Sequence, residues 1–98
     1  MAKRLWSIFT DDMDICIKTG QWGVERHHIF SHTSNEKVLS EKYGFIAPLI
    51  PRLHPNGSRR GEGAKEVDEE LRIKCQEYYE EHYGDRDDFR REFGKSYL

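Results

Sequence analysis

The stretch Val24-Glu25-Arg26-His27-His28-Ile29-Phe30 places two adjacent histidines among β-branched and aromatic residues. Such residues favour a strand, and neighbouring side chains of a strand point to opposite faces. His27 and His28 therefore cannot both fill a core. At least one of them must face solvent, a metal ion or a substrate.

The composition indicates one small domain. The chain has 98 residues, of which 36% are hydrophobic, 35% charged and 12% aromatic. So many aromatic rings argue against disorder, while no apolar run approaches the ~18 residues that span a bilayer. The first residues lack the apolar segment of a secretory signal. Two distant cysteines, Cys16 and Cys75, form no disulfide framework, which favours a reducing cytoplasm. Because no apolar run is long enough, we expect no association with a membrane.

The charge is unevenly distributed along the chain. Residues 1–60 carry nine Lys and Arg against six Asp and Glu, whereas residues 61–98 carry seven against twelve. Nucleic-acid-binding domains are usually basic, so DNA would have to bind through the N-terminal half. The acidic half is either one solvated helix face or a surface for a host protein.

Hydrophobic patterns and turn residues predict strands followed by helices. We expect a short strand over residues 3–9 that buries Trp6 and Phe9. A strand over 24–30 is followed by a polar loop over 31–40 and a second, paired strand over 43–50. The proline- and glycine-rich stretch 51–63 is a long turn.

The pattern changes its period at Ala64. Apolar residues then recur every three or four positions, which predicts a helix of about twenty residues that Gly84 ends. Its predicted buried face consists of Ala64, Val67, Leu71, Cys75, Tyr78 and His82. Asp85 caps a final short helix with Phe89 and Phe93 on one face. The predicted fold is a single α+β domain with a short β-hairpin on a long helix and a short C-terminal helix.

A third histidine lies before the long helix, in the rigid turn His54-Pro55-Asn56-Gly57. The order strand, strand, turn and helix, with histidines on the first strand and before the helix, is what a one-metal phosphodiesterase site needs. One imidazole acts as general base on water, and a divalent cation stabilises the phosphate and the leaving oxygen. Arg52, Arg59 and Arg60 flank the turn and can hold a phosphate backbone.

Several segments together resemble small HNH (ββα-metal) endonuclease-like proteins of phages and prophages. The resemblance covers roughly residues 14–98. Its matching segments are Glu25-Arg-His-His-Ile-Phe30, Ser40-Glu-Lys-Tyr-Gly44, Leu53-His-Pro-Asn-Gly57, Gln76-Glu-Tyr-Tyr79 and Phe93-Gly-Lys-Ser-Tyr-Leu98. It implies a ββα-metal core over residues 24–83, preceded by a strand and turn region (1–23) and followed by a helix and tail (84–98). It also implies DNA cleavage in the cytoplasm of a bacterial host.

By this resemblance His27 is a metal ligand, His28 the general base and His54 the second ligand. Glu62 or Glu66 could supply a carboxylate ligand. Such a site favours Mg²⁺ or Mn²⁺, which prefer oxygen ligands and keep waters, with Zn²⁺ or Ni²⁺ as alternatives.

The chain departs from the family where the relatives bind zinc. Thr19 stands where the second cysteine of the Cys-x-x-Cys knuckle is expected after Cys16. Ile50 stands where relatives have a cysteine or a histidine, and Leu53 stands where they have the first histidine of a pair. We therefore expect no structural zinc, with a cluster of Trp6, Phe9 and Trp22 in its place. Lys65, where relatives often have a histidine, either weakens metal binding or contacts phosphate.

Two functions remain open at this stage. One is an active phage-type DNA endonuclease, with Arg52, Arg59, Arg60 and Lys65 on the nucleic acid. The other is a degenerate, non-cleaving HNH-like protein with a phage interaction or anti-defence role, which binds a host protein or nucleic acid. A plain scaffold role is the simplest alternative. The apolar stripe of the helix does not decide between a monomer and a homodimer.

Overall fold

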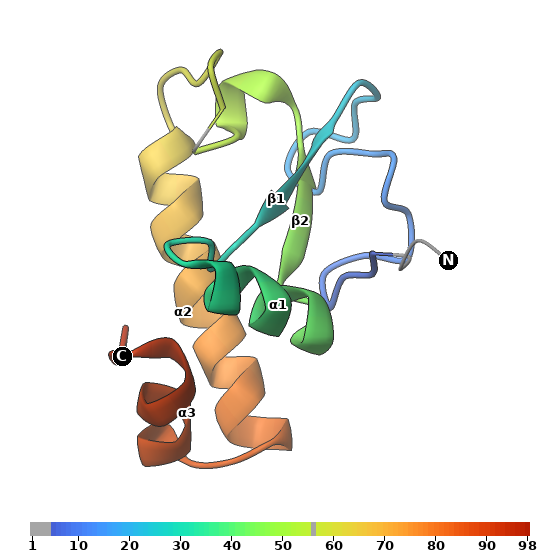
Figure 1. Ribbon diagram of the computed structural model, residues 1–98. Coiled ribbons are helices and arrows are strands. Elements are labelled where there is room, and N and C mark those ends of the chain that lie inside the picture. The colour runs from blue at the N-terminus through green and yellow to red at the C-terminus, as the bar shows by residue number, and fades with distance from the viewer. Residues whose placement is uncertain (1–4, 56) are drawn as a thin grey trace.

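The computed structural model describes residues 5–55 and 57–98, which form a small α+β fold (Figure 1). Its elements are β1 (Glu25–His28), α1 (Ser34–Tyr43), β2 (Ile46–Leu49), the 3-10 turn η1 (Pro51–Leu53), α2 (Ala64–His82) and α3 (Arg86–Phe93). Figure 1 shows α2 on one side of the two strands and the N-terminal segment on the other. In the part of the chain described, no helix is long and apolar enough to cross a membrane.

The two strands pair antiparallel, as the sequence predicts, although both are shorter than expected. Within the pairing, His27 lies opposite Ala47 and His28 opposite Ile46. Past the end of β1, the Ile29 N–H donates to the Phe45 carbonyl at 2.9 Å. Alternation along β1 buries His27 and leaves His28 half-buried, so the two rings leave opposite faces of the strand.

Helix α1 corrects the prediction of a loop over residues 31–40. The Thr33 hydroxyl accepts a hydrogen bond from the Glu36 N–H at 3.1 Å, which satisfies one of the free donors at the helix start. Gly44 ends the helix with a φ of 73°, a conformation that only glycine adopts at low cost. This helix depends on its caps because its apolar pattern is weak: Val38 at its centre is 61% exposed.

Two expectations for the N-terminal segment are wrong. Residues 5–9 form no strand; residues 3 and 4 of that prediction lie outside the described residues. The aromatic cluster also fails to form, because Trp22 is 71% exposed and Trp6 43% exposed. The Ile8 N–H instead donates to the Gly44 carbonyl at 2.9 Å, just before β2, without the regular pairing of a strand.

The turn after Cys16 packs instead against the end of β2. Cys16, Ile50 and Leu53 are buried members of one hydrophobic cluster. Burial raises the pKa of the Cys16 thiol, but hydrogen bonds from the Thr19 side chain and from nearby backbone outweigh it and bring the pKa below its ordinary value. Cys16 is 2% exposed and packs as a small buried side chain.

Helices α2 and α3 are confirmed, with one change on the buried face of α2. Gln76 and Tyr79 are buried there, whereas His82 is exposed. Helix α3 begins with a capping box in which the Asp88 N–H donates to Asp85 at 2.8 Å. The aromatic rings of Phe45, Phe89, Phe93 and Tyr97 surround Phe30 with centroids 4.6–5.8 Å away, which joins the strands to α3 and the C-terminal tail.

Candidate functional site

His27 points from β1 toward α2. It is 1% exposed, and its Nε2 lies 3.2 Å from Oδ1 of Asp68. Burial lowers the pKa of His27, because it disfavours the charged imidazolium, and the Asp68 carboxylate only partly opposes this effect. His27 is therefore a neutral imidazole near pH 7, the form that can accept a proton or ligate a metal.

His28 has a different partner on the other face of the strand. Its Nε2 lies 2.9 Å from Oε2 of Glu41, a residue of α1. The ring is partly exposed, with 22% of its side-chain surface accessible. A carboxylate on one ring nitrogen fixes the orientation of the ring. The pair thus has the arrangement of a base and its orienting group.

The turn that follows η1 brings His54 to His27. Their ring centroids are 5.0 Å apart at an angle of 61°, and Nδ1 of His54 lies 2.6 Å from Oε1 of Glu25. Gly57 permits this approach: a Cβ there would lie 2.9 Å from the Glu25 oxygen and 3.1 Å from the His54 ring. The predicted meeting of these two histidines therefore occurs.

The three predicted site histidines line one cavity of about 550 Å³. Its other lining residues are Arg26, Ser31, His32, Lys37 and Arg72. Arg26, Lys37 and Arg72 bring cationic side chains to the cavity that the sequence interpretation missed. Two of them are paired, Arg26 with Asp14 and Arg72 with Asp68, each at 3.1 Å. A signal was present for Arg26, which alternates onto the same strand face as His28, and for Arg72, which lies one helical turn after Asp68.

Asp68 is a further candidate site residue that sequence reasoning missed. It contacts His27 with one carboxylate oxygen, while the other lies 3.1 Å from a terminal nitrogen of Arg72. The predicted carboxylates, Glu62 and Glu66, are instead exposed. Glu62 precedes α2 and Glu66 lies in its first turn, whereas Asp68, two residues after Glu66, lies on the face of α2 that contacts His27 of β1.

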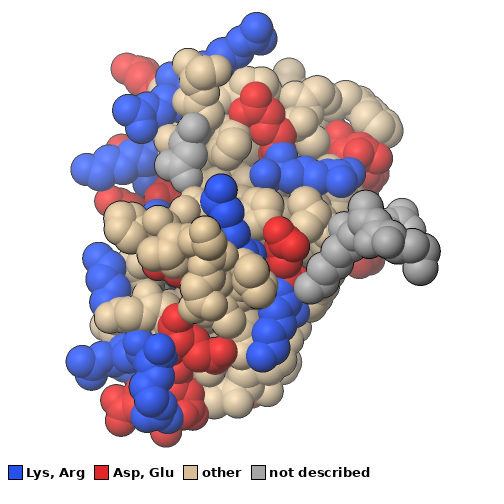
Figure 2. All heavy atoms as spheres, in the orientation of Figure 1, with Lys and Arg blue, Asp and Glu red and all other residues tan. Residues whose placement is uncertain are grey.

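The four predicted DNA-binding cations lie outside this cavity. Arg52 and Arg59 line a depression beside the exposed Trp22, while Arg60 and Lys65 line another that borders Asp68. On the face in Figure 2, Lys and Arg side chains lie along the upper and left margins and also over the centre and right, with Asp and Glu among them. Positive and negative side chains are thus interspersed over this face.

The donor types at His27, His54 and Asp68 fit a divalent cation such as Mn²⁺. Two imidazoles on one metal, with bonds of ~2.1 Å, place their ring centroids roughly 4.5–5 Å apart, and the observed spacing is 5.0 Å. Within residues 5–55 and 57–98, however, no group of three or more His, Cys, Asp or Glu side chains stands in metal-holding geometry. The fit therefore rests on two imidazoles and one nearby carboxylate.

Comparison of the chain with protein-family models, curated proteins and solved structures found no match.

Proposed function

We propose that the protein is an HNH-like (ββα-metal) hydrolase of DNA phosphodiester bonds, as its resemblance to phage and prophage endonucleases implies. The observation that carries this proposal is the single cavity shared by His27, His28 and His54, with three cationic side chains around it. A phosphodiester is an anion that needs both a base for water and positive charge for its oxygens.

In this proposal His28 is the general base that takes a proton from the attacking water. Glu41, 2.9 Å from its Nε2, is a positioning residue that holds the ring and stabilises the imidazolium as it forms. His28 can act in this way because its ring is open to the cavity. His27 is buried against Asp68 and cannot exchange protons with solvent as readily.

His27 and His54 are the proposed ligands of Mg²⁺ or Mn²⁺, and Asp68 replaces Glu62 or Glu66 as the candidate carboxylate. When bound, the cation would supply positive charge to the scissile phosphate and to the leaving oxygen. Asp68 also fixes the orientation of His27, and its other carboxylate oxygen holds Arg72 of the same helix beside the cavity.

Arg26, Lys37 and Arg72 are the proposed contacts of the scissile phosphate. Arg52, Arg59, Arg60 and Lys65 would contact DNA further away, since they lie in separate depressions. Each phosphate contact makes affinity depend on salt, so binding should weaken steeply as ionic strength rises.

A nicking assay on supercoiled plasmid DNA with Mg²⁺ or Mn²⁺ tests this function. We expect the wild type to nick the plasmid and His28→Ala to be ~10²–10⁴-fold slower, the usual worth of a general base. The control is His82→Ala, which changes an exposed histidine at the end of α2. A wild type that never cuts, or equal rates for His28→Ala and the wild type, would refute the proposal.

One observation favours the non-cleaving alternative, in which the protein binds DNA or a host protein. Within the described residues no three-ligand group stands in metal-holding geometry, and the exposed face of α2 is rich in Glu. If the protein binds DNA but no metal restores cleavage, this second function is the one to retain. Charge reversal on the exposed glutamates of α2 would then test for a protein partner with a basic surface.

A further inference from the structure

A second cavity, of about 400 Å³, adjoins the histidine cavity. It is formed between the start of α1, the middle of α2 and the C-terminal tail. Its lining residues are His32, Glu36, Arg72, Phe93, Gly94, Lys95 and Tyr97. His32 and Arg72 line both cavities, so one extended ligand could occupy the two together.

The second cavity brings two cationic side chains to the aromatic ring of Tyr97. The guanidinium carbon of Arg72 is 5.5 Å from the Tyr97 ring centroid, and Nζ of Lys95 is 5.0 Å from the same centroid.

The carboxylate in the lining is that of Glu36, and it is already engaged. Its Oε1 accepts a hydrogen bond from the His32 N–H at 3.4 Å. Arg72 shares its positive charge with Asp68, 3.1 Å away. Lys95 lies over the Tyr97 ring and forms no ion pair with a carboxylate among the described residues, so it is the cation of this cavity that can meet an anionic ligand.

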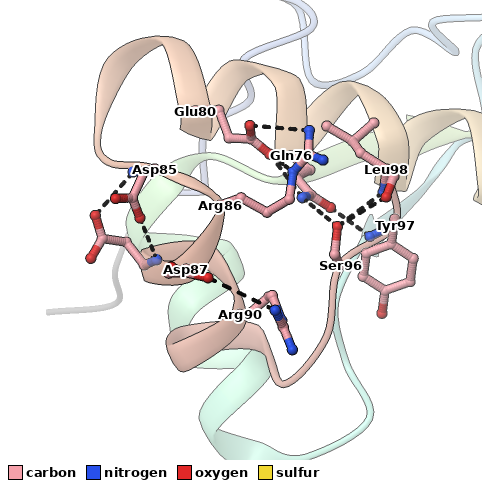
Figure 3. A network of polar contacts seen from close by, with 10 residues as sticks. Gln76, Glu80, Asp85, Arg86, Asp87, Arg90, Ser96, Tyr97 and Leu98 are labelled. Carbon is pink, nitrogen blue, oxygen red and sulfur yellow. Dashed lines mark hydrogen bonds and ion pairs between the residues drawn. The ribbon is translucent and has the colours of Figure 1, made fainter.

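The tail that carries Lys95 and Tyr97 is held in place by a buried side chain. Gln76 is 0% exposed, its Nε2 donates to Ser96 Oγ at 2.9 Å, and its Oε1 accepts from the Tyr97 N–H at 2.6 Å (Figure 3). The Tyr97 ring also packs 5.6 Å from that of Phe30. The subsite is thus preorganised, because the ligand need not pay to order the tail.

We propose that Arg72, Lys95 and Tyr97 form a second phosphate subsite, which binds the DNA phosphate next to the one in the histidine cavity. The adjoining cavities place the two subsites along one strand, and Tyr97 offers a ring against the sugar or base between them. The inference rests on the proposed function only in that a phosphodiester occupies the first cavity. It does not require that the bond be cut.

Binding of a fluorescent DNA duplex, measured by anisotropy in metal-free buffer, tests the subsite separately from cleavage. The test variant is Lys95→Gln. The matched control is Lys74→Gln, which removes the same charge from a lysine of α2 that pairs with Glu70 at 3.9 Å. One phosphate contact contributes ~0.9 to the slope of log affinity against log salt, or about 3.5-fold between 50 and 200 mM.

We expect Lys95→Gln to lower the salt slope by ~0.9 and to weaken binding at low salt severalfold, with little change in Lys74→Gln. Glu36→Gln should tighten binding, because it removes the opposing charge. Equal effects of the two lysine variants, no effect of Lys95→Gln, or no binding by the wild type would overturn the subsite. If the expected pattern appears but the wild type never nicks DNA, the subsite stands and the hydrolase proposal fails.

Discussion

Replacing Gln76 by Leu tests how the C-terminal tail is attached. Leucine has about the size of glutamine and can remain in the buried position on α2, but it cannot hydrogen-bond. The change removes the bond to Ser96 Oγ, at 2.9 Å, and the bond from the Tyr97 N–H, at 2.6 Å. It also removes a bond to Glu80 at 2.8 Å, although Glu80 keeps Arg86 as a partner at 3.2 Å.

The expected loss of stability follows from these contacts. Each neutral hydrogen bond contributes ~1 kcal/mol net, and a buried partner left without a bond costs ~1–3 kcal/mol. The apolar leucine offsets ~1 kcal/mol of this loss. The free energy of unfolding should therefore fall by about 2 kcal/mol, which corresponds to a decrease in Tm of roughly 8–16 °C for a domain of this size.

Urea unfolding followed by far-ultraviolet circular dichroism measures this loss. Ser96→Ala is the matched partial variant: it removes one of the two bonds to the tail and should cost about half as much. A decrease below ~0.5 kcal/mol for Gln76→Leu would show that the tail is not held by this side chain. It would also remove the argument that the second cavity is preorganised.

Three further predictions concern the site and the turns. Burial holds the pKa of His27 below 6.5, so His27 takes up a proton more readily in the unfolded chain than in the folded one. The free energy of unfolding should therefore fall as the pH drops below ~6.5, by up to ~1.4 kcal/mol per pH unit. His27→Asn should flatten this part of a plot of urea midpoint against pH, and an unchanged plot would contradict the assignment. Gly94→Ala should cost ~1 kcal/mol, because Gly94 has a positive φ. Gly44→Ala should cost more, because Gly44 also has a positive φ and its added Cβ would lie 2.7 Å from the Trp6 ring. Equal losses in thermal unfolding would contradict the clash. Glu41→Gln should slow plasmid nicking ~10–100-fold at unchanged stability if it positions His28, and an unchanged rate would remove that role.

The elements that the sequence predicts well are those with strong local signals. Helix α3 is predicted because Asp85 caps it and Phe89 and Phe93 lie on one face. Helix α1 is missed because its apolar pattern is weak, although Thr33 and Glu36 form the beginning of a capping motif. A search for the Ser/Thr-x-x-Glu pattern would have found it.

The site residues also divide into those with a clear signal in the sequence and those without one. His27, His28 and His54 stand out in the sequence, and all three line the cavity. Asp68 does not stand out, since it is one acidic residue in a helix with many. Its selection over Glu62 and Glu66 depends on which face of α2 lies beside β1, and that is a property of packing between segments 41 residues apart.

The sequence by itself determined that His27 and His28 leave opposite faces of a strand, because side-chain alternation is a local property of extended backbone. Only the tertiary structure decided what each of them meets. His27 meets Asp68 and His54, and His28 meets Glu41. These partners are fixed by how α1, α2 and the turn after η1 pack around the strands, and such long-range contacts leave no periodic signal in the chain.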